Sequence, residues 1–219
     1  MRIGELSRRA GVPVPTIKYY VREGLIPGGE RIGPNQARYD EAHIHRLKLV
    51  RAMVEVGKLS VATTREVLSA IDSPGSSLHE VLGIAQAAVT PQVTASDRAG
   101  WTLAEQVVTE LVARRGWVVK ESNPARQALA QLVVTFRDLG QDDLLGVLED
   151  YAAVAERLAA AELAAIGHRE GVDSKVEGAV LGTVLGDALI GAMRRLAQAD
   201  ASHRAFEGAA GRAPDPAAR

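Results

Sequence analysis

The sequence contains no cysteine among its 219 residues. This absence excludes disulfide bonds, thiolate zinc or iron–sulfur sites and cysteine nucleophiles. Long apolar runs are also scarce. Residues 1–9 lack the apolar core of a signal peptide, and the most apolar stretch, residues 178–193, is short for a membrane span and contains Asp187. We therefore expect a cytoplasmic protein without membrane contact.

Sequence motifs of common enzymes are missing as well. We find no P-loop, dinucleotide fingerprint, nucleophile elbow or HExxH motif. The histidines are scattered, and His43 and His45 stand two residues apart, so they would point in different directions on a helix. The sequence therefore predicts no catalytic residue, no metal site and no cofactor.

Charge is nearly balanced overall, at a net −1, but it is unevenly distributed. Residues 1–72 carry twelve Lys/Arg against eight Asp/Glu, a net +4, and the rest carries fourteen against nineteen, a net −5. A basic first third indicates that this part alone faces a polyanion such as DNA. Chance scatter of surface charge is the competing explanation.

The first third of the chain has the pattern of short helices joined by tight turns. Apolar residues on one face predict a helix over residues 3–10, which ends at Gly11. Pro15 suits the first turn of a second helix, which runs through residues 16–23 and ends at Gly24. Two such helices around a glycine-containing turn are typical of a helix-turn-helix.

A glycine- and proline-rich hairpin is expected next, over residues 27–39. Beside a helix-turn-helix, such a hairpin would be a wing. Asp40 and Ser60 are expected to cap two further helices, over residues 40–57 and 60–71.

The remaining two thirds show helical spacing and no strand alternation. Further helices are expected over residues 77–90, 97–115, 124–139, 141–166 and 173–198. We predict a mainly α protein in four parts. These are a winged helix-turn-helix DNA-binding domain at 1–72, a linker with a short helix at 73–96, an all-helical effector or dimerisation domain at 97–207 and a flexible tail at 208–219.

Several motifs of the first third occur in a characteristic order and spacing. They are Ile3-Gly4-Glu5-Leu6-Ser7, Ala10-Gly11-Val12, Thr16-Ile17-Lys18-Tyr19-Tyr20, Gly24-Leu25-Ile26-Pro27, Arg38-Tyr39 and residues 47–57. With these motifs, residues 1 to about 71 closely resemble the MerR family of bacterial transcription regulators. The resemblance implies a homodimer that binds a pseudo-palindromic promoter operator, distorts the DNA and acts with RNA polymerase.

Two alternatives remain open for the part after the DNA-binding domain. The resemblance implies dimerisation through a long helix that follows the domain, but the corresponding stretch, residues 78–89, is short and is followed by Pro91. A small organic effector is one expectation for the helical part. The other is an architectural DNA-binding protein whose helical domain only oligomerises or docks a protein partner.

The second helix supplies most of the expected DNA contacts. Thr16, Tyr19 and Arg22 share a face, and Lys18 adds a further donor, whereas Tyr20 either packs in the core or places its hydroxyl on a phosphate. The wing candidates would contact the DNA backbone, unless they belong to a merely solvated loop. The full set of expected contacts is Pro15, Thr16, Lys18, Tyr19, Tyr20, Arg22, Arg31, Gln36 and Arg38.

Departures from the family pattern concern three positions. The family usually carries arginine at Lys18, which loses the bidentate fork but keeps the charge, and an acidic residue at Val21. The wing arginine, Arg38, is displaced by one position from the common pattern.

Four aromatic side chains are the candidates for an effector pocket, because only 4% of the residues are aromatic. They are Trp101, Trp117, Phe136 and Tyr151. Ordinary core packing is the alternative for each tryptophan.

Gly178, Gly182 and Gly186 recur every four residues and would form a smooth ridge on one helix. This ridge predicts close helix packing, with the centre of the bundle slightly favoured over a dimer interface. Asp187, within the ridge, would pair with Arg194 or with a group on another helix, or would lie at the surface.

Overall fold

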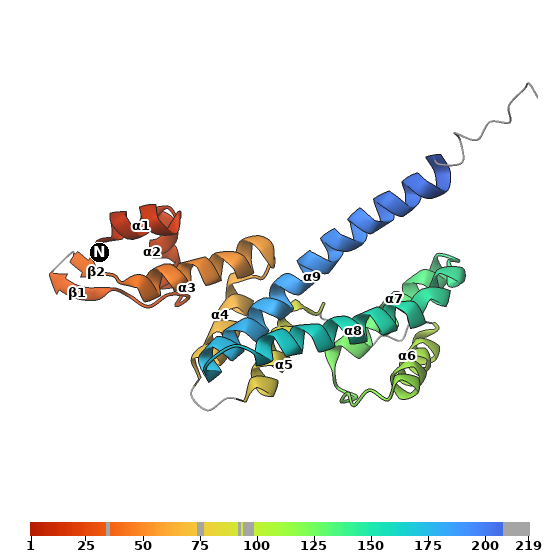
Figure 1. Cartoon of the computed structure of the whole chain (residues 1–219). Coiled ribbons are helices and arrows are strands. Elements are labelled where there is room, and N and C mark those ends of the chain that lie inside the picture. Colours follow the sequence, from red (N-terminus) through yellow and green to blue (C-terminus); the bar gives the residue numbers. More distant parts are fainter. Residues whose placement is uncertain (34–35, 74–76, 92, 94–98, 208–219) are drawn as a thin grey trace, which may run out of the picture.

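The computed structural model describes residues 1–33, 36–73, 77–91, 93 and 99–207 (Figure 1). Its helices are α1 (Ile3–Ala10), α2 (Val14–Arg22), α3 (Glu41–Arg51), η1 (Ala52–Val56), α4 (Val61–Asp72), α5 (Leu78–Val89), α6 (Trp101–Arg115), α7 (Pro124–Asp138), η2 (Asp142–Val147), α8 (Leu148–Gly167), α9 (Val172–Ser202) and η3 (His203–Glu207). Strands β1 (Glu30–Gly33) and β2 (Gln36–Arg38) form an antiparallel hairpin. The mainly helical fold class and the hairpin of the wing are therefore confirmed. The predicted tail at 208–219 lies outside the described residues.

The expected helix ends are also present in the first third. Gly11 follows α1 with a φ of 66°, the left-handed conformation that favours glycine. Asp40 and Ser60 accept the backbone N–H groups of His43 and Thr63 at 3.2 and 3.0 Å. Local sequence signals therefore set where these helices begin and end.

A single buried cluster holds the helix-turn-helix together. Leu6 of α1, Ile17 of α2, and Leu47 and Val50 of α3 are fully buried in it. Truncating a buried leucine of this kind to alanine costs about 2–5 kcal/mol of stability. The cluster fixes α2 against α1 and α3 and so decides which side of α2 faces outward.

The same cluster extends beyond the predicted DNA-binding domain. Val81 of α5 and Val176, Val180 and Val184 of α9 are buried in it, and α9 runs beside α4 and α5 in Figure 1. His45 of α3 also lies 2.7 Å from the carboxylate of Glu177. The first half of the last helix is thus part of the core that supports the DNA-binding domain.

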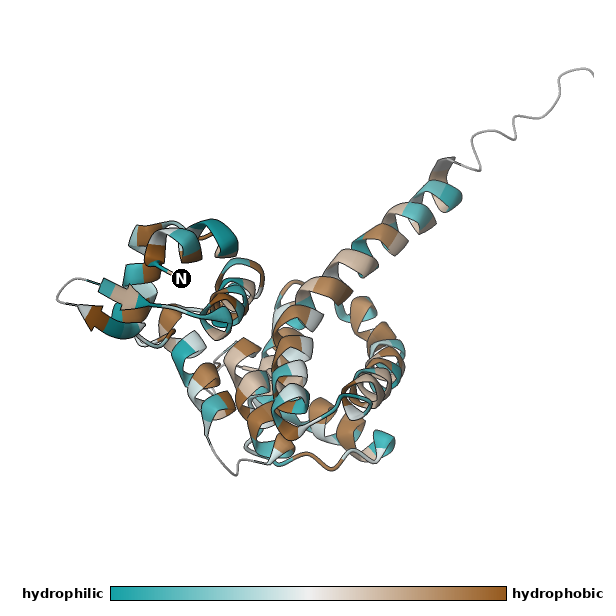
Figure 2. Ribbon diagram, turned by 60° about the vertical axis from the view of Figure 1, so that its left-hand side comes forward, coloured by the Kyte–Doolittle hydropathy of each residue, from teal (hydrophilic) through white to brown (hydrophobic). Residues whose placement is uncertain are grey.

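The second half of α9 projects away from that core (Figure 1). The segment Val172–Phe206 is long and apolar enough to cross a membrane by length and composition, and Figure 2 shows its apolar residues. Its first half, however, contributes Val176, Val180 and Val184 to a protein core. Burial in a core explains that part of its apolar character without a membrane.

A smaller cluster joins α6 and α7. Trp101, Val108 and Val133 are among its buried members. Arg115 of α6 forms ion pairs with Glu149 and Glu156 of α8, at 3.0 and 3.5 Å. These ion pairs connect α6 to α8, and α8 in turn packs on α9.

The glycine ridge of α9 does not form the centre of a bundle, contrary to the favoured expectation. Gly178 lies beneath the guanidinium of Arg169, a β-carbon added at Gly182 would meet open space, and Gly186 faces Glu162. Of the three alternatives for Asp187, the structure shows the surface position: Asp187 is exposed, and in the described residues Arg194 lies over the ring of Tyr151 and does not pair with Asp187. Helical spacing identified the small-residue face but could not identify its neighbour.

Gly57 marks the tightest contact between the DNA-binding domain and α9. A β-carbon at this position would lie 2.2 Å from Cγ1 of Val184. We expect Gly57→Ala to lower the free energy of unfolding by about 1–3 kcal/mol, because a packed core resists an added methyl group. Denaturant unfolding measures this change.

Two further variants test whether the contact with Val184 is the cause. Gly182→Ala also adds a methyl group, but it meets open space within the helix, so we expect unchanged or slightly increased stability. Val184→Ala removes the nearer of two clashing atoms, the other being the carbonyl oxygen of Met53 at 2.8 Å from the added β-carbon, so its cost should not add fully to that of Gly57→Ala. Full additivity of the two costs would contradict this account.

Candidate nucleic-acid interface

Helix α2 presents a polar outer side opposite its buried residues. Ile17 is fully buried, Lys18 and Tyr19 are exposed, and Arg22 is exposed over most of its side chain. The guanidinium carbon of Arg22 lies 5.2 Å from the centroid of the Tyr19 ring, so the two side chains stack. This side of α2 offers an ammonium group, a phenol and a guanidinium, which are donors suited to phosphates and base edges.

Two arginines anchor the end of α2 to later helices. Arg46 of α3 donates to the carbonyl of Leu25 at 3.0 Å, and Arg65 of α4 donates to the carbonyl of Glu23 at 2.6 Å. These bonds satisfy carbonyl groups that follow the last turn of α2. The helix is thereby held rigidly relative to the rest of the domain.

Tyr20 is the member of the expected contact set whose ring faces inward. Its side chain is only 6% exposed and belongs to the core, and burial raises the pKa of its hydroxyl. The core-packing alternative therefore describes its ring. A contact of its hydroxyl with a phosphate stays a prediction.

The wing lies beside α2 and shares a hollow with it. Lys18 of α2 and Gln36 of β2 line this hollow of about 390 Å³ together with Arg2. Sequence reasoning missed Arg2, since only the fold brings the start of the chain next to the recognition helix. The three polar side chains together extend the donor surface from the helix to the wing.

The remaining expected contacts are exposed or half-buried. Pro15 is exposed and Thr16 is half-buried in the first turn of α2, and Arg31 is exposed in β1. Arg38 donates to Glu30 across the hairpin at 2.8 and 3.0 Å. This ion pair is exposed, so it opens at little cost if a phosphate competes for the guanidinium.

The four aromatic candidates do not form one pocket, which corrects the expectation of a shared effector site. Trp101 is buried between α6 and α7, and its indole Nε1 has no hydrogen-bond partner in the described part of the chain. Trp117 donates to Glu156 at 2.7 Å and borders one cavity, whereas Phe136 and Tyr151 border another. These side chains were selected by residue type alone, and the fold places them at three different sites.

The cavity beside Trp117 lies between α5, α8 and α9 and has a volume of about 550 Å³. Glu162 and Asp187 line it, and neither carboxylate has a hydrogen-bond or ion-pair partner within the residues described. Burial raises the pKa of both groups, and the charge of Asp187 raises that of Glu162 further. This cavity contacts both the core of the DNA-binding domain, through α5 and α9, and the later helices.

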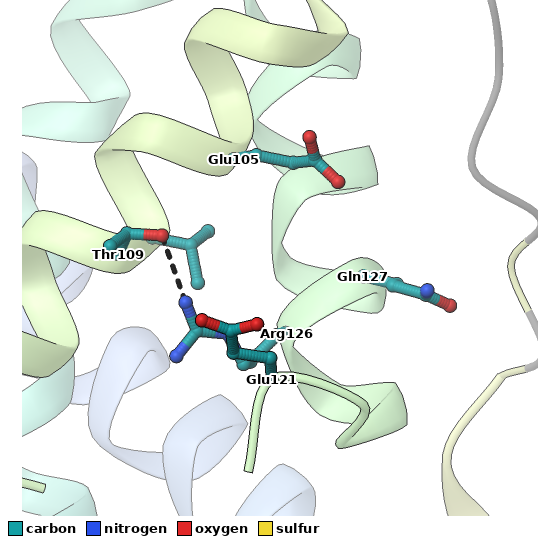
Figure 3. Close-up of a pocket in the computed structure, with 6 residues that line it drawn as sticks. Glu105, Thr109, Glu121, Arg126 and Gln127 are labelled. Carbon is teal, nitrogen blue, oxygen red and sulfur yellow. Dashed lines mark hydrogen bonds between the residues drawn. The ribbon is translucent and has the colours of Figure 1, made fainter. Parts of the chain in front are cut away.

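A smaller hollow of about 260 Å³ lies between α6 and α7 (Figure 3). It is polar, and Arg126 crosses it to donate to the hydroxyl of Thr109 at 2.8 Å. Glu105 and Glu121 also border it. Its charged lining distinguishes it from the apolar cavity beside Phe136.

The arrangement of α1, α2 and the hairpin defines a winged helix-turn-helix DNA-binding protein. A model of the MerR HTH family regulatory protein matches residues 1–71. The HTH-type transcriptional regulator HmrR of Rhizobium leguminosarum bv. viciae is 34% identical over 90 residues, which cover 41% of this chain and 68% of HmrR. The chain belongs to the MerR family of DNA-binding transcription regulators.

The other similar proteins match this chain over different shares of their own length. The mercuric resistance operon regulatory protein of Bacillus cereus is 43% identical over 56 residues, 26% of this chain and 42% of that protein. The match to the ZntR homolog of Haemophilus influenzae likewise spans 37% of that protein. By contrast, the crystal structure of SCO5550 from Streptomyces coelicolor A3(2) matches 94% of this chain and 98% of its own, with 32% identity and a TM-score of 0.68. The helical part after the DNA-binding domain is therefore shared with SCO5550.

Proposed function

We propose that this protein is a cytoplasmic regulator that binds a pseudo-palindromic promoter operator as a homodimer and alters the DNA conformation in response to a small organic effector, acting with RNA polymerase. The observation that carries the DNA-binding part is the exposed donor side of α2, formed by Lys18, Tyr19 and Arg22 over a buried Ile17. Pro15, Thr16, Arg31, Gln36 and Arg38 extend it at the helix start and in the wing.

A stripe that begins at Leu185, which packs partly against the core, and continues along the projecting half of α9 supports the homodimer. Leu185, Leu189, Ala192 and Leu196 are spaced by four, three and four residues, the pattern of a coiled-coil seam. Leu189 and Leu196 are 65% and 68% exposed. We call these four residues the α9 stripe. Pairing with the same stripe of a second copy would bury it and set two recognition helices at a fixed spacing.

The absence of cysteine supports an effector of another kind than the one that the names of two relatives give. Both are mercuric resistance operon regulatory proteins, but this chain has no cysteine thiolate to bind a soft metal. Two cavities of about 550 and 570 Å³ border α9 instead, and both are large enough for a small organic molecule. Because α9 also packs on the DNA-binding domain, a ligand beside it could change the placement of that domain.

Selection of bound sequences from a random pool of DNA duplexes tests the proposal, because this experiment does not require a known operator. A two-fold symmetric consensus, bound with a steep dependence on salt concentration, is the expected outcome. Sequence-independent binding would favour an architectural protein over an operator-specific regulator.

A further inference from the structure

A second cavity, of about 570 Å³, lies between α7, η2, α8 and α9. Its wall from α7 consists of Leu129, Leu132, Val133 and Phe136, which share one face of that helix. Helix η2 and the residue after it add a second apolar wall, formed by Leu144, Leu145, Val147 and Leu148. Leu132, Leu144 and Val147 are each between 44% and 53% exposed, so this apolar surface is open to solvent.

The polar groups of this cavity come from one side. Tyr151 lines it from α8, and Arg194 and Gln198 line it from α9, one helical turn apart. The guanidinium carbon of Arg194 lies 5.5 Å from the centroid of the Tyr151 ring, which places the charge at the cavity. Arg194 has no carboxylate partner among the residues that the structure describes, and no acidic residue in that part of the chain lines the cavity.

An apolar cavity with one unpaired cation at its edge fits a ligand of matching polarity. We propose that this cavity binds a small amphipathic carboxylate, such as a medium-chain fatty acid. Its hydrocarbon part lies between α7 and η2, and its carboxylate accepts hydrogen bonds from Arg194. The planar guanidinium fork suits a carboxylate, and burial of the chain removes apolar surface from water.

The position of the cavity connects it to the DNA-binding domain, and this step rests on the effector role proposed above. Arg194 stands ten residues after Val184, which is about 15 Å along the same helix. Val184 is the residue that touches Gly57 at the end of η1. A ligand that draws Arg194 toward α7 and η2 therefore acts on a helix that the DNA-binding domain packs against.

Isothermal titration with decanoate, below its micelle concentration and without DNA, tests the site. We expect decanoate to bind the full-length protein and decyltrimethylammonium, its cationic counterpart, to bind far more weakly. Arg194→Gln should weaken decanoate binding roughly 10- to 100-fold, the range for a lost hydrogen bond to a charged group. Equal binding of the two amphiphiles, or of decanoate to Arg194→Gln and the wild type, would overturn the proposal.

Two matched variants separate the charge from the apolar wall. Arg195→Gln removes the neighbouring arginine, whose guanidinium lies over Gly191 and does not line the cavity, so decanoate affinity should not change. Leu144→Asn should weaken both decanoate and the neutral decanol, whereas Arg194→Gln should weaken decanoate only. A loss of decanoate binding in Arg195→Gln equal to that in Arg194→Gln would also contradict the assignment.

Operator binding, measured in parallel with decanoate binding, distinguishes a failure of the ligand site from a failure of the proposed function. If decanoate binds through Arg194 but leaves operator affinity unchanged, the site stands and the effector role fails. If operator binding is intact and decanoate does not bind, the site is overturned while the DNA-binding function stands.

Discussion

Replacing Lys18 with alanine is expected to weaken operator binding about tenfold at moderate salt and to reduce the slope of log K against log salt concentration by about one. Lys18 is exposed on α2, beside Gln36 and Arg2, where its ammonium group can reach a phosphate. The fold should be unaffected, since the side chain contributes nothing to the core. Fluorescence anisotropy with the selected operator at several salt concentrations measures both quantities.

Tyr19→Phe refines this test, because it removes one hydroxyl and retains the ring stacked on Arg22. A single hydrogen bond contributes about 0.5–1.5 kcal/mol, so the expected loss of operator affinity is up to about tenfold, without a change in salt slope.

The matched control for Lys18→Ala is Lys120→Ala, which removes a lysine from the loop between α6 and α7, away from α2. If Lys120→Ala weakened binding as much as Lys18→Ala, the assignment of the interface to α2 would be wrong.

The sequence was sufficient to predict the first third of the fold. The helix over residues 3–10, the glycine after it and the caps at Asp40 and Ser60 all depend on interactions within a few residues. Alternation of buried and exposed positions on α2 likewise follows from helical spacing. Tyr20 was ambiguous because a tyrosine is compatible with both a core and an interface, and only the packing against other helices decides between them.

Prediction was weaker where a helix has several neighbours. The small-residue face of α9 was visible in the sequence, but not that Gly178 lies under Arg169 while Gly182 and Gly186 border a cavity. The aromatic candidate Trp101 begins α6, whereas Trp117 follows the end of that helix and donates to Glu156. The contact between Trp117 and Glu156 joins residues 39 positions apart, and helical periodicity does not encode contacts of that range.

The double substitution Leu189→Glu and Leu196→Glu is expected to convert the proposed homodimer to a monomer and to weaken operator binding at least about 100-fold. Both side chains are exposed on the α9 stripe, so the substitutions do not open a core. In a paired seam, by contrast, the new carboxylates of both copies would be brought together and desolvated. Light scattering coupled to size-exclusion chromatography measures the mass, and circular dichroism verifies that α9 remains helical.

The loss of DNA affinity should exceed that of any single contact variant. Two linked recognition helices bind one operator with an advantage of about 10²–10⁴ over one helix, because the second contact is intramolecular. Ala201→Glu is the matched control, since it adds a carboxylate to the same exposed half of α9, on a face away from Leu189 and Leu196 and outside the lining of the cavity that Arg194 borders. A double variant that stays dimeric would refute the α9 stripe as the interface. If it became monomeric yet bound the operator at full strength, the need for a dimer would be refuted instead.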